Sequence, residues 1–130
     1  MNAKITATAH YLPKRVLTNA ELEKMVDTSD EWIRSRTGIS ERHIVAENEA
    51  SSDMATEVAK ALLKKRGISG NDVDVIIIAT VTPDHFTPST AALVQINIEA
   101  ENAWGFDLNA ACTGYLYALE TGNKLVSSGA

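Results

Sequence analysis

The sequence has a single cysteine, three histidines and no long hydrophobic run. A lone cysteine cannot form an internal disulfide, so we expect a reducing, cytoplasmic compartment. His10, His43 and His85 lie far apart and follow no metal-ligand spacing, so we expect no metal site. No apolar stretch approaches the roughly 18 residues needed to cross a bilayer. These absences argue against a disulfide-stabilised, metal-binding or membrane-spanning protein.

Basic residues are also outnumbered. Lys and Arg total 12 against 17 Asp and Glu, a formal net charge of −5. A nucleic-acid binder needs the opposite balance to neutralise phosphates, so we expect no nucleic-acid partner. The chain does have the composition of a globular domain, with 45% hydrophobic residues in a length of 130. That is enough for one hydrophobic core.

The first third of the chain carries local signals for one strand and two helices. Residues 3–9 alternate weakly and are rich in Thr and Ile, which predicts a strand. Thr18 with Glu21 has the capping-box spacing, and so has Thr28 with Glu31. Each pair predicts the start of a short helix, and the second helix should end before Gly38.

The rest of the chain alternates helical and strand patterns. The β-branched run "VDVIIIATV" is typical of a strand buried on both faces. Thr87 and Pro88 have the residue types of an N-cap and first helical position. The expected elements are a helix at 53–66 with Gly67 as its C-cap, a strand at 73–81, a helix that begins at Pro88, a strand at 103–108 and a helix from 113 with Gly129 as its C-cap. This alternation predicts a layered α/β sheet with buried parallel strands.

Cys112 lies in "FDLNAACTGY", where a predicted strand meets a predicted helix. The simplest role of a free cysteine is to pack as a small buried hydrophobe. Its small neighbours also allow a sharp turn, like the nucleophile elbow of serine enzymes. The start of a helix favours the thiolate, and a backbone N–H there can face an oxyanion. Position alone therefore leaves packing and nucleophilic catalysis both open.

Three segments together resemble one enzyme family. They are "DTSDEWIRSRTGISERH" at 27–43, "PST" at 88–90 and "AACTGYLYAL" at 110–119. They resemble β-ketoacyl-acyl carrier protein synthase III, the thiolase-fold acyltransferase that starts bacterial fatty-acid synthesis. The resemblance implies a layered α-β-α architecture with a mixed sheet. It also implies that residues 1–130 are the N-terminal domain, which carries the nucleophilic cysteine.

The resemblance assigns the chemistry to Cys112. In the family, this cysteine takes an acyl group from acyl-coenzyme A and passes it to malonyl-acyl carrier protein, with loss of carbon dioxide. Its backbone N–H forms half of the oxyanion hole. Coenzyme A is then part of a substrate rather than a permanently bound cofactor. The full-length enzyme is expected to be a homodimer.

The same resemblance assigns the coenzyme A entrance. Trp32 matches the tryptophan that stacks on adenine, although a core tryptophan in a short helix is the simpler structural interpretation. Its charged neighbours favour an exposed ring. Thr28, Arg36 and Thr37 match positions at the same entrance, and Arg36 is suited to phosphate because it is planar and always protonated. Arg34 and Arg42 are either solvated charges or contacts for the acidic carrier protein.

Two departures from the family pattern matter. Many members have a bulky Phe directly before the Pro-Ser pair, at the floor of the acyl pocket, where this chain has Thr87 with Phe86 one residue earlier. We expect a deeper pocket that accepts primers longer or more branched than acetyl. The His and Asn that assist decarboxylation belong to a second half of the family that this chain lacks. We therefore expect a fragment that does not condense by itself and that self-associates through exposed apolar surface.

Two other functions are compatible with the sequence. One is another thiolase-fold, coenzyme A-dependent synthase, such as a polyketide or hydroxymethylglutaryl-coenzyme A synthase, against which the segment from Trp32 to Arg36 argues. The other is a non-catalytic α/β interaction module in which Cys112 only packs.

Overall fold

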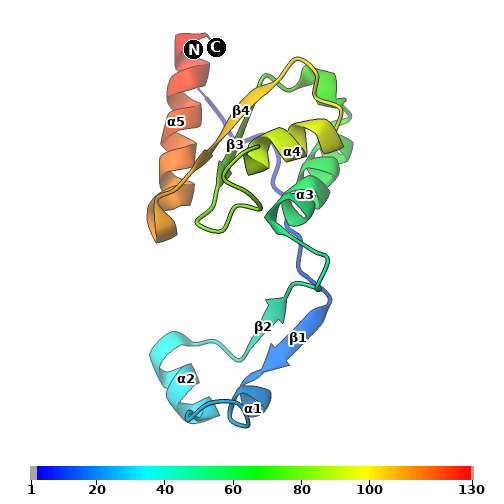
Figure 1. The fold of residues 1–130 in the computed structure, drawn as a ribbon. Coiled ribbons are helices and arrows are strands. Elements are labelled where there is room, and N and C mark those ends of the chain that lie inside the picture. Colours follow the sequence, from blue (N-terminus) through cyan, green and yellow to red (C-terminus); the bar gives the residue numbers. More distant parts are fainter. Residues whose placement is uncertain (1–2, 130) are drawn as a thin grey trace. The chain divides into compact units, whose positions relative to one another are not determined.

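The computed structural model describes residues 3–129, which form two compact units. The Trp32 unit is Leu12–Glu49. The Cys112 unit joins the residues up to Tyr11 with those from Ala50 onward. Each unit contains its own two-stranded sheet, and Figure 1 labels the elements of both.

The Trp32 unit is built on an antiparallel strand pair. β1 (Arg15–Thr18) pairs with β2 (Glu41–Ile44). α1 (Asn19–Leu22) begins directly after β1, and the expected capping box is confirmed: the Thr18 hydroxyl accepts from Glu21 N–H, while the Glu21 carboxylate accepts from Thr18 N–H. β2 was not predicted, because its charged residues take the extended form through pairing with β1 rather than through their own pattern.

α2 (Asp30–Thr37) ends where the sequence predicted, since Gly38 takes the left-handed φ of +74° that a C-cap glycine favours. Its start requires a correction. The N-cap is Ser29 rather than Thr28, and the Ser29 hydroxyl accepts from Trp32 N–H at 3.1 Å. Because Ser29 caps the helix, α2 begins one residue later than the Thr28–Glu31 spacing indicates.

The strand expected at residues 3–9 is also wrong. No strand lies there, and β1 begins only at Arg15. Residues Ile5 to Ala9 instead line an apolar cavity of about 670 Å³ together with residues of β3 (Val75–Ala79) and of α3 (Ser51–Arg66). A strand requires a hydrogen-bonded neighbour, and the cavity separates this segment from β3.

The Cys112 unit contains the parallel sheet that the sequence predicted. β3 pairs with β4 (Trp104–Leu108) in parallel, and α4 (Thr90–Asn97) connects them. α4 packs against both strands and against α3, while α5 (Gly114–Ser128) lies on the other side of the strand pair, as Figure 1 shows. α3 ends at the predicted Gly67, and α5 ends at Gly129.

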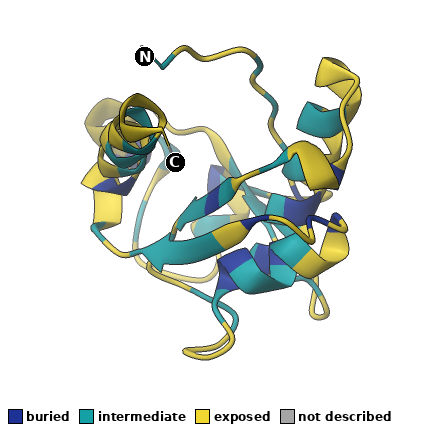
Figure 2. Cartoon of the chain, turned by 90° about the horizontal axis from the view of Figure 1, so that it is seen from above, coloured by how far each residue is buried: buried dark blue, intermediate teal, exposed yellow. Residues whose placement is uncertain are grey.

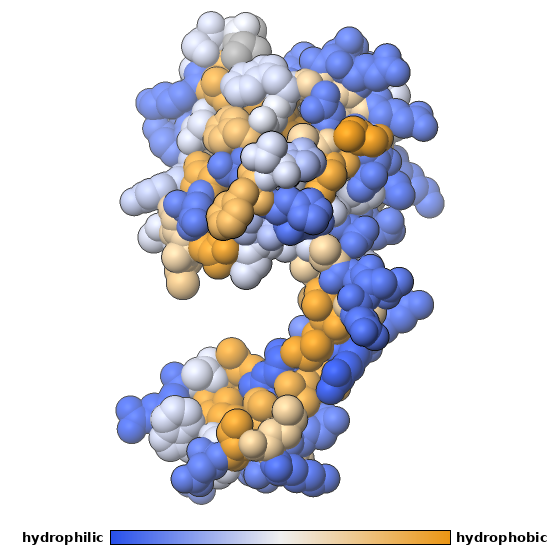
Figure 3. All heavy atoms as spheres, in the orientation of Figure 1, coloured by the Kyte–Doolittle hydropathy of each residue, from blue (hydrophilic) through white to orange (hydrophobic). Residues whose placement is uncertain are grey.

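The core of this unit lies between the strands and α4 (Figure 2). Gly105 allows β4 to lie close to β3, because a Cβ at this position would lie 2.6 Å from the Ile76 carbonyl oxygen. β3 was expected to be buried on both faces, but Ile76 is its one buried residue. The reason is incomplete cover on the face toward α5, where Leu116 and Leu119 of that helix are themselves exposed. Figure 3 shows apolar side chains at the surface of this unit.

Within the described residues, no helix is both long enough and apolar enough to cross a membrane.

Candidate functional site

Cys112 lies at the joint that the sequence predicted. β4 ends at Leu108, a short 3₁₀ turn η2 (Ala111–Thr113) carries the cysteine, and α5 begins at Gly114. The Cys112 side chain is exposed. It therefore does not pack in the core of its unit, and its thiol is accessible to a reagent or substrate.

The turn that presents Cys112 is sharp. Ala111 has a φ of +44°, in the left-handed region that side chains with a Cβ rarely adopt. The turn is held by Thr113, whose N–H and hydroxyl both donate to the Ala110 carbonyl, at 3.1 and 2.8 Å. Strained backbone residues cluster at functional sites, and here one lies next to an exposed thiol. The small residues around Cys112 thus make the kind of turn expected of them.

A loop between β3 and α4 carries Phe86 and Thr87. Both are exposed, and the Phe86 side chain is fully so. The loop is tied to the start of α3: the Ser51 hydroxyl donates to the Thr82 carbonyl at 2.7 Å, and Asp84 accepts from both the N–H and the hydroxyl of Ser52. These bonds hold the loop beside α3 even though its outer side chains are in solvent.

Asp107 holds the far end of this loop. Its carboxylate, on β4, accepts from Thr90 N–H at 2.7 Å and from Ala91 N–H at 2.8 Å. The N-cap of α4 is Ser89 rather than the expected Thr87. The Ser89 hydroxyl accepts from Ala92 N–H at 3.2 Å. The helix therefore begins after Pro88 rather than at Pro88. Asp107 was missed in the sequence, although a lone carboxylate in the apolar run "WGFDL" was a signal.

A cavity of about 440 Å³ lies between this loop and β4. Its lining includes His85 and Phe86 from the loop, Phe106 and Asp107 from β4, and Asn109 just before the cysteine turn. Thr87 is not among its lining residues. The structure therefore brings Phe86, rather than Thr87, to a cavity beside the strand that leads to Cys112.

The residues expected at the coenzyme A entrance lie on or next to α2. Trp32 is 57% exposed and Arg36 is exposed, so the expected exposure of the ring is confirmed. Residues four apart share a helix face, which places these two side chains together. Thr28 is half-buried before the helix. The Thr37 hydroxyl is engaged locally, donating to the Ile33 carbonyl at 2.7 Å and accepting from Ile39 N–H at 3.1 Å.

The two neighbouring arginines differ in their contacts. The Arg34 Nη1 atom lies 3.9 Å from Asp30 Oδ2. Both side chains are about half exposed or more, so this ion pair contributes little to stability. Arg42 is half-buried, and its guanidinium donates to the Asn19 side-chain oxygen at 2.9 Å and to the Leu17 carbonyl at 3.3 Å. Arg42 is thus part of the framework of its unit.

No family model matches the chain. It is 60% identical over 131 residues to β-ketoacyl-[acyl-carrier-protein] synthase III of Chlorobium phaeovibrioides, covering 100% of this chain and 40% of that protein. It is 57% identical to the Streptococcus sanguinis enzyme of the same name, over 98% of this chain and 39% of that enzyme. The crystal structure of 3-oxoacyl-[acyl-carrier-protein] synthase III from Aquifex aeolicus superposes with a TM-score of 0.89 at 51% identity, over 94% of this chain and 39% of the other.

The fold is of the thiolase type, as the sequence predicted. With identities of 57–60% along nearly the whole chain and this shared fold, the chain is similar to the β-ketoacyl-acyl carrier protein synthase III enzymes, and it spans about 40% of the length of the curated relatives that it matches.

Proposed function

We propose that the complete protein containing this chain is a β-ketoacyl-acyl carrier protein synthase III, in which Cys112 accepts an acyl group from acyl-coenzyme A. The exposed cysteine on a strained turn between β4 and α5, in a chain similar to these enzymes, carries the proposal. Both units then belong to the N-terminal domain of that enzyme, a dimer of the cytoplasm.

The reaction proceeds in two steps. The Cys112 thiolate attacks the thioester carbonyl, the bond to the coenzyme A sulfur breaks, and coenzyme A leaves as its thiol. Malonyl-acyl carrier protein then loses carbon dioxide, and the resulting carbanion attacks the acyl-cysteine carbonyl, which releases the Cys112 thiolate. A covalent intermediate divides one difficult condensation into two easier reactions. We place the histidine and asparagine that polarise the malonyl thioester outside residues 1–130.

Coenzyme A binds as part of the substrate, at α2. The exposed Trp32 ring offers a face for adenine, and stacking of this kind contributes about 1–3 kcal/mol. Arg36, on the same face of the helix, pairs with a phosphate. Thr28 and Thr37 line the same entrance. The Thr37 hydroxyl also holds the end of α2 by donating to the Ile33 carbonyl.

The test uses a hybrid synthase, in which residues 1–130 replace the matching segment of the Chlorobium phaeovibrioides enzyme. After incubation with acetyl-coenzyme A, intact-mass measurement should show one added acetyl group, and malonyl-acyl carrier protein should then yield ketoacyl product. Cys112→Ala should abolish both. An acetyl adduct that persists in Cys112→Ala, or a hybrid that makes no product, refutes the proposal.

A further inference from the structure

Asn19 is a buried amide in the Trp32 unit. It is the first residue of α1 and only 2% exposed. Its side-chain nitrogen donates to the Asp30 carboxylate at 2.7 Å and to the Ile39 carbonyl at 2.9 Å. Its side-chain oxygen accepts from Arg42 at 2.9 Å. An amide has two N–H donors and an acceptor oxygen, so both donors and the acceptor are used.

The partners of Asn19 lie on both sides of α2. Asp30 is the first residue of that helix, and Ile39 follows its C-cap. Arg42 belongs to β2, and the Asn19 backbone N–H donates to the Ser40 carbonyl at 3.2 Å. One side chain therefore ties both ends of α2 to the strand pair of the unit.

α2 depends on such ties for its position. It has eight residues, and Ile33 is its one buried side chain. A helix this short is not stable by itself in water. Its start is also held by Glu23, whose carboxylate accepts from Asp30 N–H at 2.6 Å in an exposed setting. Asn19 supplies the part-buried bonds that fix the orientation of the helix.

We infer that Asn19 is a positioning residue for the coenzyme A end of the substrate, which rests on the function proposed above for Trp32 and Arg36. Without the Asn19 amide, α2 loses the bonds that Asn19 makes to both of its ends, and the ring and guanidinium that it presents lose their fixed geometry. Binding of the nucleotide weakens, whereas the thioester reaction at Cys112 is untouched. The expected signature is a higher KM with an unchanged kcat.

Asn19→Asp in the hybrid synthase tests this inference, because it keeps the shape of the side chain, removes both donors and places a carboxylate beside Asp30. The substrates compared are acetyl-coenzyme A and acetyl-pantetheine, which carries the same thioester without the nucleotide. We expect KM for acetyl-coenzyme A to rise about tenfold, with kcat within about twofold, as for loss of charge-assisted hydrogen bonds. Kinetics with acetyl-pantetheine should not change.

The matched control is Asn97→Asp in the Cys112 unit, where the amide donates to the Thr56 hydroxyl at 3.0 Å. This variant should leave KM for both substrates unchanged. In a Trp32→Ala background, Asn19→Asp should raise KM by less than it does in the unsubstituted hybrid, because the part of its effect that acts through the ring is already lost. Equal losses with both substrates, or full additivity with Trp32→Ala, would overturn the positioning role.

A second variant covers the case in which Asn19→Asp does not fold. Asp30→Ala removes one of the three partners of the Asn19 side chain at a half-exposed position, and it should give a smaller rise in KM for acetyl-coenzyme A alone. An unchanged KM in Asp30→Ala overturns the inference while the proposed function stands. A hybrid synthase that makes no product without any substitution refutes the proposed function itself.

Discussion

Two buried threonines of the Cys112 unit differ in whether their hydroxyl has a partner. The Thr56 hydroxyl accepts from Asn97, whereas the Thr90 hydroxyl, which is fully buried, has no hydrogen-bond partner among the described residues. A buried polar group without a partner costs about 1–3 kcal/mol, and its removal relieves that cost.

Thr90→Val should therefore raise the free energy of unfolding by about 1 kcal/mol, and Thr56→Val should lower it by about the same amount. Thermal unfolding of the hybrid synthase measures both. The two substitutions are chemically identical, so they control for each other. A destabilisation by Thr90→Val as large as that by Thr56→Val would show that the Thr90 hydroxyl is satisfied in solution.

Thr87 does not line the cavity beside β4 in this chain, so we propose that it acts in the complete dimeric enzyme, where its side chain should determine how large an acyl group is accepted. We propose that threonine in place of the bulkier phenylalanine admits longer or more branched primers. Thr87→Phe should lower kcat/KM for isobutyryl-coenzyme A by about tenfold while changing that for acetyl-coenzyme A less, the scale expected for a few methylene groups. Acylation rates of Cys112 measure this. A strict preference of the unsubstituted hybrid for acetyl-coenzyme A would contradict this proposal. So would an equal effect of Thr87→Phe on kcat/KM for acetyl- and isobutyryl-coenzyme A. Phe86 lines the cavity beside β4, so Phe86→Ala serves as the comparison.

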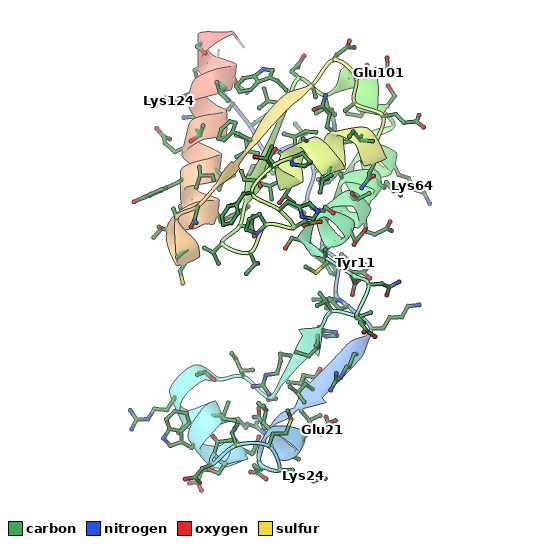
Figure 4. The ribbon with its side chains drawn as sticks, viewed as in Figure 1. Tyr11, Glu21, Lys24, Lys64, Glu101 and Lys124 are labelled. Atoms are coloured by element: carbon green, nitrogen blue, oxygen red, sulfur yellow. The ribbon has the colours of Figure 1, made fainter. Side chains whose placement is uncertain are left out.

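At the scale of the element, α1 depends on its capping box. Figure 4 labels Glu21 on this helix. Hydrogen bonds from the Thr18 N–H and hydroxyl hold the pKa of the Glu21 carboxyl below its ordinary value, with further lowering by Arg15 and Lys24. A carboxylate with a lowered pKa contributes stability that is complete above its ordinary pKa and is lost as the pH falls through the folded value.

Glu21→Gln should therefore be less stable than the unsubstituted protein at neutral pH, and the difference should shrink as the solution is acidified. NMR titration of the Glu21 carboxyl and thermal unfolding across the acidic range measure the two quantities. Thr18→Val, which removes the hydroxyl donor, should move the pKa of Glu21 back toward its ordinary value. A Glu21 carboxyl that titrates at its ordinary pKa contradicts this account.

At the scale of the whole molecule, much apolar surface is left without cover. Leu116, Leu119 and Val126 of α5 are exposed, and the cavity of about 670 Å³ beside β3 is lined largely by apolar side chains. The chain also spans about 40% of the curated relatives. Exposed apolar surface of this kind promotes association.

The 130-residue chain by itself should therefore self-associate and form no ketoacyl product. Sedimentation at increasing concentration measures the association, and an assay with acetyl-coenzyme A and malonyl-acyl carrier protein measures the product. The hybrid synthase is the positive control. Ketoacyl product from the isolated chain, or a monomer at all concentrations, would contradict this prediction.

Much of the fold could be predicted where the signal is local. The helix ends at Gly38, Gly67 and Gly129, the capping box of Thr18 with Glu21, and the strand-to-helix joint at Cys112 each depend on residues a few positions apart. The exposure of Trp32 followed in the same way from its charged neighbours. Two cap positions were one or two residues wrong, because several hydroxyls compete for the same amide and only one reaches it.

The sequence by itself determined the helices, the parallel α/β arrangement, the location of Cys112 and the resemblance to β-ketoacyl-acyl carrier protein synthase III. Only the tertiary structure decided which extended segments pair, so that β2 is a strand and residues 3–9 are not. It also revealed that Asn19 ties both ends of α2 and that Asp107 holds the start of α4. These features are contacts between residues 11 to 23 positions apart, and no local pattern encodes which distant partner a buried amide or carboxylate meets.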